Sequence, residues 1–201
     1  METFLDGRHS VRHFNPRDTL PRSLAQSILE HASQAPSGNN FQPWRVVVVR
    51  DKEKQAHLAQ LAAGQVQVKD ASAVFLVFGD KLAYDLDWWQ EFHLQRGAIS
   101  RAEVAGKLSR IEAYFKLHPE DKDLEGLRLD VGLFAMNLMH VVRSFGYDSV
   151  PMRGADFTAI KAYLQLPENW EPILMLPVGK ALTPGYPHAR RPVKDFTRFI
   201  D

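Results

Sequence analysis

The strongest constraint on the fold is the segment 124–145, which carries apolar side chains on nearly every side of a helical projection. Gly146 follows it, as is typical of the residue just past a helix C-terminus. A helix that is apolar all round is buried all round, so we expect a central helix that a partner chain helps to cover. Its most apolar part, 131–142, is too short to cross a bilayer and is interrupted by Asn137 and His140, so no membrane span is expected.

The rest of the chain predicts a helix-rich α/β domain with few strands. Apolar residues recur on one helical face over 21–34, with Pro21 in the first turn and Pro36 after the end. Short β-branched or aromatic runs predict strands at 45–50, 73–79 and 173–178, and Pro177 is expected near an edge or end. The aromatic-rich segment 84–122 is mostly helical by pattern, and an extended arm follows Lys180. A chain of 201 residues is expected to form one domain, 1–201.

Composition excludes several classes of function. The chain has no cysteine, so disulfides, thiolate nucleophiles and cysteine-ligated metals are excluded, and redox chemistry would need a bound cofactor. The net charge of +1 provides no overall field for a nucleic acid or an anionic membrane. The amino-terminal segment lacks the apolar core of a secretory signal, so a cytoplasmic protein is expected. Glycine-rich dinucleotide, P-loop and zincin motifs are absent, and no metal site is expected.

The segment RHSVRHF is the first candidate binding site. Arg8 and Arg12 flank Ser10, and guanidinium groups four residues apart can reach one phosphate from a helical turn. We therefore predict a phosphate site near a short amino-terminal helix. The alternative is a solvated basic patch.

The second candidate is the turn-rich loop 35–44, which reads APSGNNFQPW between the first helix and the first strand. Small residues there let the backbone approach a planar ligand, and Asn40 and Gln42 can hydrogen-bond to it. The alternative is an ordinary loop after a helix stop.

Together these blocks resemble the amino-terminal signature of the nitroreductase family of FMN-dependent oxidoreductases: R-x-S-x-R/K-x-F, then P-S-x-x-N-x-Q-P-W before a strand. Similar segments follow in the family's order at 62–72, at 149–154 and at 188–192, where HARRP stands in place of a K-x-R motif. The resemblance implies an α+β fold with a small mixed sheet surrounded by helices. It also implies an intertwined homodimer with an extended carboxy-terminal arm.

The resemblance assigns residues to four parts of an FMN site. The phosphate and ribityl chain would take Arg8, His9, Ser10, Arg12, His188 and Arg190. The pyrimidine edge of the flavin would take Gln67, with Gln65 as a second candidate. Beside the ring would lie Pro151, Met152, Arg153 and Gly154, whose backbone would support flavin N5. The other subunit would contribute Pro36, Ser37, Gly38 and Asn40.

Two positions depart from the family's pattern. Many relatives have lysine where Gln67 stands, and a neutral side chain there would leave the flavin potential lower unless Lys69 compensates. Relatives have lysine where His188 stands, so phosphate binding is expected to weaken as the pH rises.

Aromatic side chains of the 84–122 segment are either plain core or the lining of a substrate pocket. The pocket candidates are Trp88, Trp89, Phe92 and Phe115. His140 lies in the apolar helix and is expected to be a hydrogen-bonded core or interface histidine rather than a metal ligand.

The activity implied by the resemblance is electron transfer from NADH or NADPH to a small electron-poor acceptor, such as a nitroaromatic or a quinone, by a ping-pong cycle. Hydride would pass to flavin N5, with the reacting atoms about 3–3.5 Å apart. No side chain is assigned as a general acid. Alternatives are dehalogenation, heterocycle oxidation or flavin-consuming chemistry, a non-catalytic FMN store or sensor, and, more distantly, a nucleic-acid-binding module.

Overall fold

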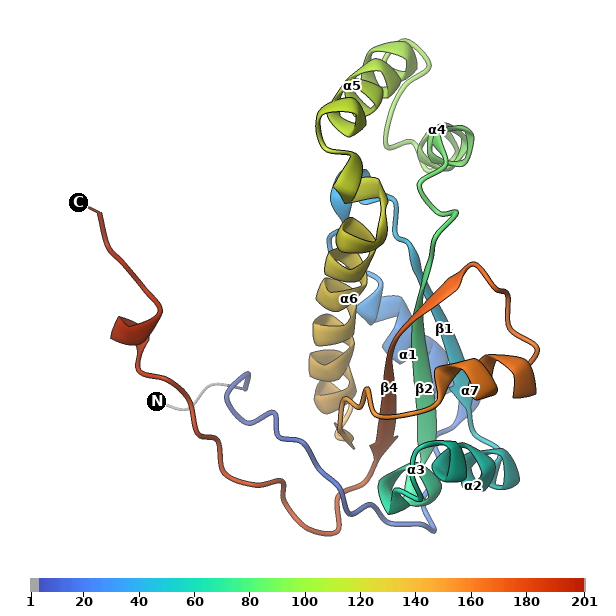
Figure 1. Ribbon diagram of the computed structural model, residues 1–201, viewed down its shortest axis with the longest axis vertical. Helices are drawn as coiled ribbons and strands as arrows, with labels where there is room; N and C mark the ends of the chain where they lie inside the picture. The colour runs from blue at the N-terminus through green and yellow to red at the C-terminus, as the bar shows by residue number, and fades with distance from the viewer. Residues whose placement is uncertain (1–3, 201) are drawn as a thin grey trace.

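The computed structural model describes residues 4–200, and one four-stranded sheet organises them (Figure 1). The strands run in the order β1 (Trp44–Val49), β2 (Ala73–Asp80), β4 (Trp170–Gly179) and β3 (Asp148–Ser149). Each named strand is antiparallel to its neighbours. Within 4–200 the parallel pairing of this sheet is a single bridge from Ser10 to Ser149, so the expected mixed character rests on that bridge.

Helices cover both faces of the sheet. The α-helices are α1 (Arg22–Ala32), α2 (Lys52–Leu61), α3 (Val66–Asp70), α4 (Leu86–Gln95), α5 (Val104–Leu117), α6 (Leu124–Ser144) and α7 (Phe157–Tyr163). Short 3₁₀ turns are η1 (Gly38–Asn40), η2 (Pro119–Lys122) and η3 (Val193–Asp195). This is an α+β arrangement, as the resemblance to the nitroreductase family implied.

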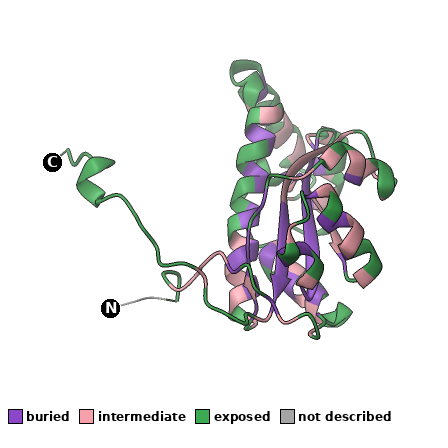
Figure 2. Ribbon diagram, turned by 60° about the horizontal axis from the view of Figure 1, so that its bottom comes forward, coloured by how far each residue is buried: buried purple, intermediate pink, exposed green. Residues whose placement is uncertain are grey.

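Strand β2 forms the centre of the core because every one of its residues is buried (Figure 2). Phe75 and Val77 pack in one cluster with α1 and α6. Leu76 and Phe78 pack in a second cluster with α2, α3 and α7. This alternation along one strand produces a three-layer molecule.

Local sequence explains several helix starts. Asp51, Asp85 and Asp156 each accept a hydrogen bond from a backbone N–H of the first turn that follows, at 2.9, 2.6 and 2.9 Å. A side-chain oxygen at this position satisfies one of the free donors at a helix N-terminus. These residues therefore fix where α2, α4 and α7 begin.

Helix α6 confirms the prediction for 124–145 in its bounds but not in its burial. It ends before Gly146, whose φ of 72° suits the residue after a helix. Leu129, Leu133 and Met136 are 63%, 42% and 42% exposed, so the single chain leaves one apolar face of this helix uncovered. The prediction that a partner covers it stays a prediction.

The other predicted elements are confirmed with small shifts at their ends. Helix α1 occupies the middle of 21–34, and β1, β2 and β4 coincide with the three apolar runs. Pro177 lies two residues before the end of β4, and a second proline, Pro172, lies at a bulge opposite Phe78. A proline nitrogen has no hydrogen for the ladder, which explains the irregularity there.

The chain after Lys180 is an extended arm that leaves the body of the molecule, as Figure 1 shows. Tyr186, Phe199 and Ile200 are 75%, 78% and 86% exposed along it. Across residues 4–200, none of the helices combines the length and the apolar character that crossing a membrane would require.

Candidate functional site

The amino-terminal segment 8–14 and the start of the arm, 180–188, meet beside the short strand β3. Val11 N–H donates to the Ser149 carbonyl at 3.2 Å, which places the 8–12 segment along the sheet edge. Leu182 N–H donates to the His13 carbonyl at 2.8 Å, so the arm begins antiparallel to this segment. The 8–12 segment is therefore extended, and the expected short helix near Arg8 is wrong because the backbone pairs with the sheet edge instead.

This pairing brings four of the predicted phosphate residues together. The rings of His9 and His188 stack with their centroids 3.9 Å apart, and His9 Nδ1 lies 2.9 Å from the Tyr186 carbonyl. A Cβ on Gly185 would lie 2.6 Å from the Cβ of His9, so only glycine permits this close approach. Arg190 follows two residues after His188, and the pKa of Arg8 is lowered first by burial and then by the charge of Arg190.

The cluster of Arg8, His9, His188 and Arg190 consists of cationic or protonatable side chains. Burial raises the pKa of the neighbouring Asp148, and the charges of Arg143, Lys180 and His9 oppose that rise. Burial is the larger cause that lowers the pKa of Arg8, and its Nη1 is buried without a hydrogen-bond partner. The pKa of His188 is also lowered, first by desolvation and then by the charges of His9 and Arg190. Positive groups that oppose one another's charge favour a multiply charged anion.

Arg12 and Ser10 lie next to this cluster but face a separate hollow. Arg12 donates to the Ser10 carbonyl at 3.2 Å and lies over the Tyr186 ring, 5.6 Å from its centroid. With residues 183–186 of the arm they line a cavity of about 360 Å³. Arg12 is thus held by the arm itself.

The predicted residues for the pyrimidine edge form a second group. Gln67 is 7% exposed, and its Nε2 donates to Gln65 Oε1 and to Met152 Sδ, the latter at 3.7 Å. Pro151, Arg153 and Gly154 are exposed beside them, and a Cβ on Gly154 would meet nothing within 4 Å. Lys69 points to solvent. An open surface with amide groups at its edge suits a planar heterocycle.

The 36–40 segment is held by contacts that sequence reasoning did not foresee. Gly38 N–H donates to Asp130 Oδ1 at 2.8 Å, and Tyr84 OH donates to Asp130 Oδ2 at 3.0 Å. Ser37 Oγ accepts from Gln42 N–H at 2.9 Å. Burial raises the pKa of Asp130. One buried carboxyl on α6 therefore anchors the loop.

Within one chain this loop lies far from the cation cluster. Asp130 contacts the loop, whereas His140, ten residues further along α6, lies near Arg8, whose charge lowers the pKa of His140 after the larger effect of burial. Ten helical residues span about 15 Å. Figure 1 shows the loop and the amino-terminal segment at opposite ends of α6. The structure thus brings the predicted site together in two parts, and a partner's contribution stays a prediction.

The sequence model of the nitroreductase family matches residues 5–180 of this chain. The chain belongs to the nitroreductase family.

Two solved structures and one curated relative illustrate the family's range. A nitroreductase-like protein from Streptococcus mutans is 66% identical, with a TM-score of 0.96 over 98% of this chain and 97% of that one. A nitroreductase from Exiguobacterium sibiricum, solved in complex with FMN, is 32% identical, with a TM-score of 0.89 over 98% and 95%. YdgI of Bacillus subtilis, named as an NAD(P)H nitroreductase, is 33% identical over 94% of this chain and 92% of its own.

The aromatic residues of this nitroreductase-family chain divide between core and surface. Trp89 and Phe115 are 5% and 8% exposed and pack with Phe41, so the core alternative holds for their rings. Trp88 is 40% exposed, stacks on Phe92 at 5.0 Å and lines a cavity of about 170 Å³. Trp89 also borders a larger cavity.

Within the single chain the Nδ1 of His140 is buried without a hydrogen-bond partner, and its role as a core or interface histidine stays a prediction. Among residues 4–200 no group of three or more histidine, aspartate or glutamate side chains could hold a metal ion. The missed anchor, Asp130, had a visible signal in the sequence: it is an acidic residue directly before the most apolar part of the helix, 131–142.

Proposed function

We propose that this chain is an FMN-dependent oxidoreductase that passes electrons from NADH or NADPH to small electron-poor acceptors such as nitroaromatics or quinones. The observation that carries the proposal is the buried Arg8 Nη1, which has no partner and lies beside Arg190 and His188. The FMN complex of the Exiguobacterium relative and the NAD(P)H in the name of YdgI support the choice of cofactor and donor.

The residues present fit FMN. Arg8, Arg190, His9 and His188 would hold its phosphate, because a buried guanidinium nitrogen without an acceptor matches an anionic oxygen. Ser10 and Arg12 would border the ribityl chain, and Gln65 and Gln67 would meet the pyrimidine edge. Pro151, Met152, Arg153 and Gly154 would border the ring, with the Gly154 N–H directed to N5. FMN when bound would supply the two-electron chemistry, and the chain's own residues would bind and orient it.

We further propose that the site is completed by a second copy of the chain. Leu129, Leu133 and Met136 follow one another at helical spacings of four and three, so they form one exposed apolar stripe on α6. An antiparallel contact through this stripe would carry the 36–40 loop of one chain toward the cation cluster of the other. Pro36, Ser37, Gly38 and Asn40 would then face the cofactor of the partner subunit.

A ping-pong cycle is the kinetic form we expect, with donor and acceptor using the same open face in turn. The exposed surface around Gly154 accommodates either of them. Use of NADH or NADPH is consistent with a cytoplasmic enzyme.

The test is a native purification followed by anaerobic mixing. We expect a bound flavin in the absorbance spectrum and its prompt bleaching by NADH, NADPH or both. Bound flavin that neither nucleotide bleaches would replace the proposal with a non-catalytic FMN store. A protein that contains no flavin and takes up none from added FMN would overturn the proposal altogether.

A further inference from the structure

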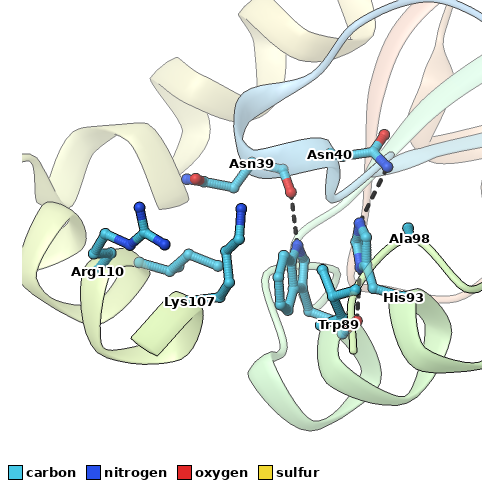
Figure 3. Close-up of a pocket in the computed structure, with 9 residues that line it drawn as sticks. Asn39, Asn40, Trp89, His93, Ala98, Lys107 and Arg110 are labelled. Carbon is cyan, nitrogen blue, oxygen red and sulfur yellow. Dashed lines mark hydrogen bonds between the residues drawn. The ribbon is translucent and has the colours of Figure 1, made fainter. Parts of the chain in front are cut away.

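A cavity of about 390 Å³ separates the 38–40 turn from helices α4 and α5 (Figure 3). Asn39 and Asn40 form one wall, Trp89 and His93 come from α4, and Lys107 and Arg110 come from α5. The cavity shares Asn40 with the proposed flavin site but does not contain the cation cluster described above.

The wall formed by the turn is rigid. Asn39 and Asn40 have φ values of 46° and 59°, in the left-handed region that side chains other than glycine rarely adopt. Trp89 Nε1 donates to the Asn39 carbonyl at 2.6 Å, and Asn40 Nδ2 donates to His93 Nε2 at 3.2 Å. The histidine is itself held, since its Nδ1 lies 2.7 Å from the Trp89 carbonyl.

The opposite wall carries two cations that are in no direct ion pair within the described residues. Lys107 and Arg110 are three residues apart on α5, so they share a helical face, and Figure 3 shows both reaching toward the space bordered by Asn39. In the described chain no carboxylate lies within ion-pair distance of either one. The carboxylate of Glu103, one turn earlier, accepts hydrogen bonds from the backbone N–H and the hydroxyl of Ser100, at 2.8 and 2.6 Å. After these hydrogen bonds, the charge of Lys107 also contributes to lowering the pKa of Glu103, but neither Lys107 nor Arg110 is in a direct ion pair within the described residues, so both can reach a ligand.

We propose that this cavity binds the carboxylate of an acidic acceptor substrate, with Lys107 and Arg110 as the specificity-determining residues. The substrate class is a small conjugated or aromatic carboxylic acid, since Ile99, Ile111 and the edge of Trp89 add apolar groups to the lining beside the two cations. The assignment to an acceptor rests on the proposed function. The cavity volume is near the lower end of the roughly 300–1,000 Å³ typical of small-molecule sites, which suits a one-ring acid better than a dinucleotide.

The experiment compares 4-nitrobenzoate with the neutral 4-nitrobenzamide as acceptors for the holoenzyme. The K107Q/R110Q double variant is expected to lose about tenfold or more in kcat/KM for the acid, through KM, and to stay within about twofold of the wild type for the amide. The matched control is Lys116→Gln, which removes an exposed cation of the same helix outside the cavity. This variant should leave kcat/KM unchanged for both acceptors.

Equal losses for acid and amide, or an acid loss shared by the Lys116→Gln variant, would overturn the proposal. A raised KM for NADH or NADPH with unchanged kinetics for the acid would assign the two cations to the dinucleotide instead. Calorimetric titration with benzoate, which cannot be reduced as a nitro group is, tests the cavity without turnover. Benzoate binding that the double variant loses would support the acid site even if the proposed electron transfer failed, and absence of benzoate binding to the wild type would refute the site alone.

Discussion

Replacing Arg8 by methionine should move apoprotein stability and FMN affinity in different directions. In the chain without FMN, the Arg8 guanidinium contributes little to stability, because its Nη1 is buried without a hydrogen-bond partner and the charge of Arg190 opposes its own. Methionine keeps an unbranched apolar stem of similar reach and removes the buried charge. The substitution therefore removes an electrostatic cost from the apoprotein and a ligand from the proposed phosphate site.

The magnitudes follow from the contacts that are lost in each state. A hydrogen bond to a charged group contributes about 1.5–3 kcal/mol, so loss of the Arg8–phosphate contact should weaken FMN binding by roughly 10- to 150-fold. In the apoprotein no hydrogen bond from Nη1 is lost, so we expect the free energy of unfolding to stay within about 0.5 kcal/mol of the wild type or to rise.

The assay uses protein stripped of flavin. Urea unfolding gives the stability of the apoprotein, and titration with FMN, followed by quenching of flavin fluorescence, gives the dissociation constant. Arg22→Met is the control, because Arg22 is an exposed arginine on α1, away from the cluster. A variant that unfolds at clearly lower urea while it binds FMN as the wild type does would show that Arg8 is structural, and the phosphate assignment would fail.

Three further predictions concern the anchor, the histidine pair and the partner contact. Asp130→Ala leaves two donors unpaired and should lower stability by about 2–4 kcal/mol in thermal unfolding, whereas Asp130→Asn keeps an acceptor and should recover most of the loss. The pKa of His188 is lowered in the free chain, and a bound phosphate would raise it. FMN affinity should therefore fall as the pH rises past that lowered pKa, by no more than tenfold per pH unit. This dependence on pH should flatten in the His188→Lys variant. Leu133→Asp should give monomers in sedimentation velocity. Leu117→Asp, which changes an exposed leucine on α5, should leave the dimer intact. Dimers that survive Leu133→Asp would refute the proposed contact through α6.

The elements that could be predicted from the sequence are those whose pattern is local. A short stretch of sequence is enough to predict each of three elements: the valines predict β1, and apolar runs predict β2 and α6. The coming together of Arg8 and Arg190 has no local pattern, since 181 residues separate them, and it was predicted from the family resemblance alone. The stacked histidines depend on pairing between two chain ends, which no window contains.

The candidate residues that the sequence missed are defined by their partners rather than by their type. Lys107 and Arg110 resemble ordinary surface cations of an amphipathic helix, and only the cavity beside them makes them candidates. Asp130 is identified as an anchor by Gly38, which lies far away in the chain, after Pro36 and Ser37. Helical periodicity predicts which face of α5 or α6 such a residue occupies, but not what lies across from it.

Two unrelated kinds of local cost occur in the segments assigned to the cofactor. Electrostatic cost lies in the cluster around Arg8, where burial and then neighbouring positive charges lower the pKa values of Arg8 and His188. Conformational cost lies in the loop before β1, where Asn39, Asn40 and Gln42 all have positive φ. Several other elements follow their local preferences, with aspartate caps at helix starts and glycine after α6. Costs of this kind persist where binding offsets them, and an anionic, planar cofactor held between two chains would offset both at once.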